Sequence, residues 1–264
     1  MLKLKKTVIF AVLLPILVSA MASLDTLEIS PCDEAVVTIF GDLICLSANR
    51  GDIVVYSNFN PTATYGRSNT EKQILLNPAG LSLDEPGSIL VLERDSRQIL
   101  SFDRFLNCRK VLPLPDEIIF PRDFTVTSEH EWLLTDDFND RIYRFTPESN
   151  RVSIWGSGYT AGPANLIRHR EAVYVFLKEE KRLRRMSAYG ILQKEFFIPD
   201  TIPTQFVFPL NNKLFALSGS KGVWLWQPEK NAIQISNLDK VIHVSQTDDL
   251  IIMIARDGTV LLRQ

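Results

Sequence analysis

Six segments of the chain share one pattern, repeated about every forty residues. Each has an apolar run, a polar turn of four to six residues, and a second apolar run ending in an aromatic or large residue. An apolar position of the first run recurs every 46, 43, 41, 41 and 36 residues, at Leu43, Ile89, Trp132, Val173, Leu214 and Leu250. In five of the six segments, an apolar residue of the second run lies ten residues after this position. In the remaining segment, which contains Leu214, the spacing is nine residues. A repeat of this length strongly constrains the fold, because each unit buries its apolar faces only against its neighbours.

The runs have the composition of β-strands. They are four to six residues long, rich in Val, Ile, Leu, Phe, Tyr and Trp, and bounded by turn-forming residues. One more strand is expected before each pair and one after it, and no segment after residue 25 has helical periodicity over three turns. Four strands at this period predict an all-β, six-bladed β-propeller over residues 23–264. The sixth unit lacks a fourth strand, so Leu24–Ile29 is expected to close the ring as the outer strand of that blade.

The turn of the third unit matches a known repeat motif. Asp136, Asn139, Arg141, Ile142 and Phe145 occupy every fixed position of D-x-x-N-x-R-I-x-x-F, and the stretch resembles the repeat of NHL-type propellers. The resemblance implies a turn between second and third strands that the Asp holds and the Arg packs over. The second unit matches loosely, with Glu93, Ser96, Gln98, Ile99 and Phe102. This supports the fold more than any activity.

The first 22 residues have the pattern of a secretory signal peptide. Three Lys precede the apolar run Thr7–Val18, and Ala20-Met21-Ala22 supplies the small residues of a cleavage site. We expect cleavage near Ala22 and a periplasmic or secreted protein without a membrane-spanning segment; an uncleaved anchor is the alternative. Removing three Lys from 29 basic residues leaves 26 against 31 acidic ones, a net charge of −5, which argues against nucleic acid as a partner.

The chain has three cysteines, Cys32, Cys45 and Cys108, so at least one thiol has no partner within the chain. Cys45 lies inside an apolar run and is expected to be a small buried hydrophobic residue. Cys32 and Cys108 fall in less regular segments and are favoured as a pair, although the connectivity is not readable from the sequence. The absence of a CxxC motif or a Cys/His group excludes a zinc or redox site of that kind.

Polar residues stand at or just before the first strand of each unit, which would line the central channel. They are Glu34, Asn77, Arg122, Asp123, Asn165, Gln205 and Lys240. By analogy with other propellers, we expect binding at this channel mouth. A resemblance to lactonase and gluconolactonase propellers implies a divalent cation such as calcium, for which Glu34, Asp123 and Asn165 would supply oxygen ligands. Turn chemistry explains polar residues at strand starts equally well, so our expectation is no metal and no other cofactor.

The largest charge anomaly is a basic cluster in the fourth unit. It comprises Arg168, Arg170, Lys178, Lys181, Arg182, Arg184 and Arg185, with Glu171, Glu179 and Glu180 interspersed. We interpret it as locally paired charges on a solvated turn; the alternative is an anionic partner, such as lipid head groups, an acidic glycan or an acidic protein face.

Streptogramin lyase propellers, which the chain also resembles, need a His and Glu pair beside a cation. His130, His169 and His243 are not spaced as a metal pair, and we interpret them as turn or packed residues.

The chain lacks the usual signatures of catalysis. It has no Gly-rich phosphate loop, G-x-S-x-G or HExxH motif. We therefore expect a binding or scaffold module for a protein, peptide or glycan, with no catalytic residue. The alternative is a metal-dependent lactonase-, gluconolactonase- or lyase-like enzyme with a cation at the channel mouth.

Overall fold

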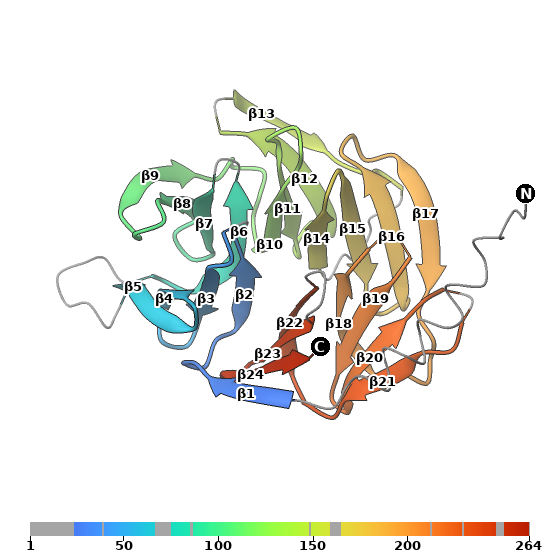
Figure 1. Cartoon of the computed structure of the whole chain (residues 1–264). Coiled ribbons are helices and arrows are strands. Elements are labelled where there is room, and N and C mark those ends of the chain that lie inside the picture. The colour runs from blue at the N-terminus through green and yellow to red at the C-terminus, as the bar shows by residue number, and fades with distance from the viewer. Residues whose placement is uncertain are drawn as a thin grey trace, which may run out of the picture.

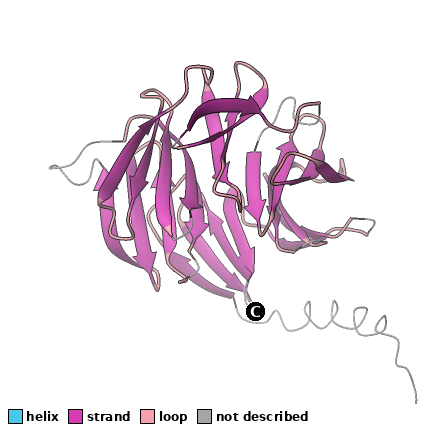
Figure 2. Cartoon of the chain, turned by 90° about the horizontal axis from the view of Figure 1, so that it is seen from above, coloured by secondary structure: helices cyan, strands magenta, loops and turns pink. Residues whose placement is uncertain are grey.

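The chain forms six four-stranded antiparallel sheets arranged in a ring, which confirms the predicted six-bladed β-propeller (Figure 1). The computed structural model describes residues 24–38, 40–66, 75–84, 87–147, 149–158, 165–211, 213–228, 230–246 and 251–263. The regular elements in these ranges are all strands (Figure 2). None of these residues forms a helix long and apolar enough to cross a membrane. The expected signal peptide, residues 1–22, lies outside the described residues.

Five blades each consist of four consecutive strands. The sixth blade has three consecutive strands and a fourth from elsewhere in the chain. Blades 1 and 2 consist of β2 (Glu34–Val37), β3 (Leu43–Ser47), β4 (Asp52–Ser57), β5 (Asn60–Gly66), then β6 (Pro78–Asp84), β7 (Ser88–Glu93), β8 (Gln98–Phe102) and β9 (Cys108–Pro113). Blades 3 and 4 consist of β10 (Pro121–Val126), β11 (Trp132–Asp136), β12 (Arg141–Thr146), β13 (Ser149–Ile154), then β14 (Asn165–His169), β15 (Ala172–Leu177), β16 (Arg182–Ser187) and β17 (Leu192–Phe197). Blades 5 and 6 contain β18 (Thr204–Pro209), β19 (Phe215–Gly219), β20 (Gly222–Trp226), β21 (Ile233–Ser236), then β22 (Val241–Gln246), β23 (Ile251–Ala255) and β24 (Thr259–Arg263).

The first strand of each blade is the innermost. Strands β2, β6, β10, β14, β18 and β22 contact one another around the ring. Residues at the start of these strands therefore lie at one end of the central channel, which we call the mouth. The turn between the second and third strands of each blade lies at the same end, because successive strands are antiparallel.

Blade 6 takes its outer strand from the other end of the chain. Strand β1 (Leu24–Glu28) pairs antiparallel with β24, beside which it lies in Figure 1. Beyond β1, the Ile29 N–H donates a hydrogen bond to the Gly258 carbonyl across 2.9 Å, and the Cys32 N–H donates to the Arg256 carbonyl across 3.0 Å. The Arg256 guanidinium also pairs with the Asp33 carboxylate, with Nε 2.6 Å from Oδ1.

The core consists of apolar layers between neighbouring blades, as expected when sheets pack face to face. Between blades 1 and 2, the rings of Tyr65 and Phe102 meet edge to face at 4.7 Å. Between blades 4 and 5, Phe215 packs on Phe196 and Trp226. Most of the aromatic residues in the strands are thus part of the core.

The cysteines lie differently from the favoured pairing. Cys32 and Cys45 are buried together in the layer between blades 6 and 1, close enough for a hydrogen bond between their thiols. Cys108 is exposed on β9 in blade 2. The favoured pair of Cys32 and Cys108 is therefore wrong, because the fold buries Cys32 between blades 6 and 1 and leaves Cys108 exposed on blade 2. The expected burial of Cys45 is confirmed, and the hydrogen bond with Cys32, together with burial, raises the pKa of its thiol.

Candidate functional site

One residue of each inner strand lies at the same level of the sheet register. Each pairs with a residue of the second strand, and that residue pairs with the apolar position that recurs in the third strand of every blade. Glu34, for example, pairs with Leu46, and Leu46 pairs with Ile53. We call these six residues the channel ring: Glu34, Gly80, Asp123, Asn165, Phe206 and His243. The sequence predicts three of them, Glu34, Asp123 and Asn165. It predicts His243 only as a turn or packed residue, because nothing in the segment around His243 marks its register.

Polar members of the channel ring are fastened to the next blade. The Asp123 carboxylate accepts hydrogen bonds from the N–H groups of Leu166 and Phe124, each across 2.8 Å, and from the Asn165 side chain. The Glu34 carboxyl group accepts one from the Leu81 backbone. Both acids lie within the inner strands, since β2 begins at Glu34 and β10 includes Asp123.

The same contact in blade 2 requires glycine. A Cβ atom at Gly80 would lie 2.9 Å from Cδ1 of Phe124, the residue after Asp123 in the next inner strand. In blade 6, His243 hydrogen-bonds to the backbone of Ala35, the residue after Glu34. Glu34, Gly80, Asp123 and His243 each contact the residue that follows the ring position in the next blade, whether the contact is polar or steric.

Burial shifts the ionisation of the channel ring. It raises the pKa of Glu34 well above its usual range, and the neighbouring Asp123 carboxyl group raises it further. Burial also raises the pKa of Asp123 to about 6, although three hydrogen bonds to its carboxylate and the Arg122 charge oppose the shift. Burial lowers the pKa of His243 to about 4, so its imidazole is neutral at neutral pH. Within the described residues, His243 Nε2 is buried without a hydrogen-bond partner.

The channel ring partly fits the oxygen ligands of a divalent cation. Glu34, Asp123 and Asn165 come together there, and two carboxyl groups with an amide oxygen are hard ligands of the kind that calcium prefers. In the part of the chain that the structure describes, however, no three His, Cys, Asp or Glu side chains are grouped as a metal site.

The other predicted mouth residues do not join the ring. Asn77 is exposed before β6, where its amide donates to Asp95 across 2.9 Å. Arg122 is exposed and forms an ion pair with Asp137 at 3.3 Å. Gln205 lies in an irregularity of β18, and Lys240 is exposed beside β22. These side chains stand on different blades around the mouth.

Asp136 holds the motif turn of blade 3, as the NHL resemblance implies. Its carboxylate accepts hydrogen bonds from the N–H groups of Ile119, Phe120 and Phe138 at 2.7, 3.1 and 2.9 Å, and from the Asn139 amide at 2.9 Å. These bonds hold the pKa of Asp136 below its usual value against the effect of burial. Arg141 is exposed.

Blade 2 repeats this turn with a different acid. Glu93 accepts hydrogen bonds from the Leu76 N–H at 2.6 Å and from the side chains of Ser96 and Gln98 at 2.8 and 2.6 Å. The loose sequence match between the two units therefore corresponds to a buried acid that holds the turn in both blades.

Four apolar side chains are exposed around these two turns. We call them the mouth patch: Leu76 (56% exposed), Ile119 (49%), Phe120 (46%) and Phe138 (70%). The Arg94 guanidinium stacks over the Phe120 ring at 5.0 Å, and its Nε donates to the Pro121 carbonyl across 2.9 Å. The patch thus spans blades 2 and 3 on backbones fixed by buried acids. The patch was not predicted from the sequence, although apolar residues in turns are a usable signal for it.

The basic cluster divides between the two faces of blade 4. Arg182 pairs with Glu180 and Glu195, and Arg184 pairs with the same two acids. Arg168 Nε donates to the Arg170 carbonyl. Arg185 lies on the opposite face of its sheet from Arg184, beside Tyr174 in the strand register.

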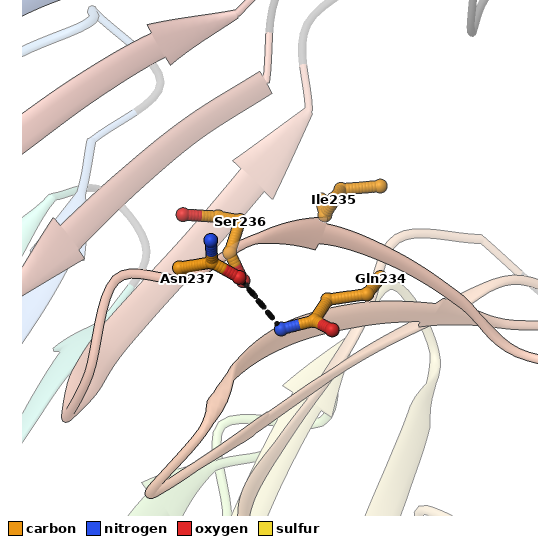
Figure 3. A pocket seen from close by; sticks show the side chains of 4 residues that line it. All are labelled: Gln234, Ile235, Ser236 and Asn237. Atoms are coloured by element: carbon orange, nitrogen blue, oxygen red, sulfur yellow. Dashed lines mark hydrogen bonds between the residues drawn. The ribbon is translucent and has the colours of Figure 1, made fainter.

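A shallow hollow lies on the outermost strand of blade 5, lined by Gln234, Ile235, Ser236 and Asn237 (Figure 3). The Gln234 amide donates to the Asn237 side chain across 2.9 Å and to the Lys221 carbonyl across 2.8 Å. This hollow is on an outer strand and contains no member of the channel ring or the mouth patch.

Solved structures with the same fold cover almost the whole chain. A gluconolactonase from Xanthomonas campestris has 12% sequence identity and a TM-score of 0.68, over 93% of this chain and 92% of that protein. Virginiamycin B lyase from Staphylococcus aureus has 11% identity and a TM-score of 0.65, over 92% and 99%. BamB from Moraxella catarrhalis has 12% identity and a TM-score of 0.55, over 92% and 98%.

Comparison at the sequence level finds no relative. No protein-family model matches the chain, and no curated protein matches it. The structural similarities, all at low identity, establish the β-propeller fold and leave the activity to be inferred from the site.

Proposed function

We propose that this protein is an exported β-propeller that binds a protein or peptide through the mouth patch. The observation that carries the proposal is the exposure of Leu76, Ile119, Phe120 and Phe138 on one face, above turns fixed by Glu93 and Asp136. A soluble protein rarely exposes a contiguous group of large apolar side chains without using it for recognition. Rigid aromatic residues lose little conformational entropy on binding, which makes them effective contacts.

The charges near the patch favour a protein or peptide over a polyanion. Arg122 is paired with Asp137, and Arg94 is stacked on Phe120 within the patch. An arginine on an aromatic ring beside exposed apolar residues is a common composition at the centre of a protein interface.

Site-specific crosslinking tests this proposal. A photoreactive p-benzoylphenylalanine is placed at position 138 of the full chain in cells that produce it, with position 105 as the control. Phe105 is similarly exposed (66%) but lies in a turn at the other end of blade 2. We expect a discrete crosslinked protein from position 138 alone, which mass spectrometry identifies.

Binding of the purified partner then provides the quantitative test. Phe120→Ala and Phe138→Ala should each weaken affinity at least tenfold, while Phe105→Ala leaves it unchanged. Equal crosslinking from both positions, or affinity unaffected by the two mouth variants, would exclude the mouth patch as the binding surface.

Export is part of the proposal and rests on the sequence of the first 22 residues. Mass spectrometry of the protein from the extracytoplasmic fraction should give an N-terminus close to Ser23. Protein that retains residues 1–22 in the cytoplasm would contradict this part of the proposal.

A second candidate function is a metal-dependent lactonase- or lyase-like activity at the channel ring. It is favoured by the meeting of Glu34 and Asp123, two carboxyl groups whose raised pKa values a bound cation would lower. In this case Ca²⁺, Mg²⁺, Mn²⁺ or Zn²⁺ should raise the melting temperature, and Glu34→Gln or Asp123→Asn should abolish that rise. A melting temperature insensitive to all four cations and to chelator would exclude this candidate.

A further inference from the structure

Three buried polar atoms of blade 4 have no hydrogen-bond partner among the residues that the structure describes. They are His169 Nε2, Tyr174 Oη and Arg185 Nε. Tyr174 is completely buried, with 0% of its surface exposed. Leaving a buried polar group unpaired destabilises the fold, so three such groups in one place indicate a missing partner.

The strand register places these residues on one face of the sheet. Tyr174 on β15 is directly opposite Arg185 on β16 and Ile167 on β14. His169 is two residues beyond Ile167 and therefore points to the same side. This face packs on blade 5, where the Tyr174 ring meets Phe215 edge to face at 5.7 Å. The three polar groups thus lie at the boundary of blades 4 and 5, towards the end of the channel opposite the mouth.

The electrostatic environment of this cluster is positive. Burial lowers the pKa of His169, and the charges of Arg170 and Arg185 lower it further. Burial raises the pKa of the Tyr174 hydroxyl and the Arg185 charge only partly opposes this rise, so the group is a neutral O–H donor. The acids of the neighbouring strand segment are engaged elsewhere, because Glu180 and Glu195 pair with Arg182 and Arg184. Glu171, in the turn beside Arg170, is exposed.

We propose that His169, Tyr174 and Arg185 form a binding site for a small oxyanion, such as inorganic phosphate or sulfate, between blades 4 and 5. The Arg185 Nε–H, the Tyr174 O–H and the Nε2–H tautomer of His169 are donors that an oxyanion accepts at several oxygens. A water molecule accepts only two hydrogen bonds and leaves the positive charge uncompensated. The buried position of the donor atoms favours a small free anion over a head group held in a lipid surface. This site is independent of the proposed function at the mouth.

Thermal melting of the full chain tests the site. Phosphate and sulfate are compared with chloride at constant ionic strength, so that general screening is equal in all samples. At tenfold excess over the dissociation constant, we expect phosphate or sulfate to raise the melting temperature by about 3 °C. Calorimetric titration with phosphate then gives the affinity.

Variants distinguish the site from general attraction of anions. Tyr174→Phe removes only the hydroxyl and Arg185→Gln removes one charge; each should weaken phosphate binding at least tenfold. Arg182→Gln removes the same charge from the same strand but from the opposite face, and should leave binding intact.

Three results would overturn the proposal. One is an equal melting temperature in phosphate, sulfate and chloride. Another is equal weakening by Arg182→Gln and Arg185→Gln, which indicates a diffuse basic surface. The third is an Arg185-dependent binding to phosphatidylglycerol vesicles without any response to free phosphate, which indicates a lipid surface as the ligand.

Discussion

The Asp123 carboxylate in blade 3 accepts a hydrogen bond from the Leu166 N–H in blade 4, across 2.8 Å. This bond joins two inner strands that are otherwise held together by side-chain packing, since each blade has its own backbone ladder. Glu34 makes the equivalent bond from blade 1 to Leu81 in blade 2. The acids of the channel ring therefore contribute to cohesion between blades at the cost of burying a carboxyl group.

Replacing Asp123 should change how stability depends on pH. Its pKa of about 6 in the folded protein exceeds the ordinary 3.8, so the folded state binds more protons than the unfolded state between these values. Asp123 therefore stabilises the fold at low pH, and this contribution is lost as pH rises towards 6. In Asp123→Asn, the free energy of unfolding at pH 6.5 relative to pH 4.5 should increase by about 2 kcal/mol. Urea titrations across this range measure the difference.

His243 should affect the pH dependence of stability in the opposite direction to Asp123. Its pKa of about 4 lies below the ordinary 6.5, so its contribution is present above pH 6.5 and is lost as pH falls through 4. His243→Gln should therefore make stability fall more steeply with rising pH than in the parent protein.

The Asp123 prediction has its own contrary outcome. If the parent protein and Asp123→Asn show the same dependence of unfolding free energy on pH, Asp123 ionises normally.

Removing the Asp136 side chain should destabilise the protein and disturb the mouth patch. Asp136→Ala leaves the N–H groups of Ile119, Phe120 and Phe138 without their acceptor, and we expect a loss of about 3 kcal/mol. Asp137→Ala is the matched control. That residue makes only a partly exposed ion pair with Arg122, and its loss should cost less than about 0.5 kcal/mol. Equal unfolding free energies for the two variants would contradict the role assigned to Asp136.

Gly258 should tolerate no side chain, because the segment after β1 passes against it. Its φ is +95°, and a Cβ atom there would lie 2.1 Å from the Ile29 carbonyl oxygen. Gly258→Ala should cost more than about 2 kcal/mol and make β1 sensitive to limited proteolysis.

Gly87 is a control that distinguishes the cost of backbone strain from the cost of the steric clash at Gly258. Its φ of +101° is similar, but a Cβ atom there meets nothing within 4 Å. Gly87→Ala should therefore cost about 1 kcal/mol and leave β1 protected. Similar proteolysis of β1 in both variants would show that the Ile29 contact is unimportant.

Oxidation should join Cys32 to Cys45 and not to Cys108. The first two thiols are in contact, whereas Cys108 is exposed on another blade. In oxidised glutathione, the two thiols would lose two protons and two electrons, and one glutathione disulfide would be reduced to two glutathiones. A bond closing this short loop should add up to about 3 kcal/mol of stability. Peptide mapping under non-reducing conditions checks the pairing, and a Cys32–Cys108 peptide would contradict it.

The repeat predicts the architecture because it depends on local patterns. The spacing between Leu43 and Ile53 reflects two antiparallel strands joined by a turn, and the register pairs the same columns in every blade. Asp136 is recognisable for the same reason, since its partners Phe138 and Asn139 are close in sequence. Glu34 and Asp123 were found because polar residues at the start of an inner strand are conspicuous.

Contacts between blades are not visible in the same way. The place of His243 in the channel ring depends on the irregularity between Val241 and His243, which shifts the register by one residue. The contact of Cys32 with Cys45 depends on how the chain passes Arg256, more than 200 residues away. Tyr174 and Arg185 belong to separate strands. The lack of hydrogen-bond partners for Tyr174 Oη and Arg185 Nε among the described residues becomes apparent only in the folded structure, where blade 5 packs on this face.

Because β1 and β24 are neighbours, blade 6 combines a strand made early in synthesis with strands made much later. Blade 1 can form early, but its contact with blade 6 must wait until β24 has been synthesised. Until that point, the nascent chain is an open arc with two uncovered sheet faces. An mRNA truncated before Thr259 would leave it permanently in that state, exposed to proteases and to other unfinished chains.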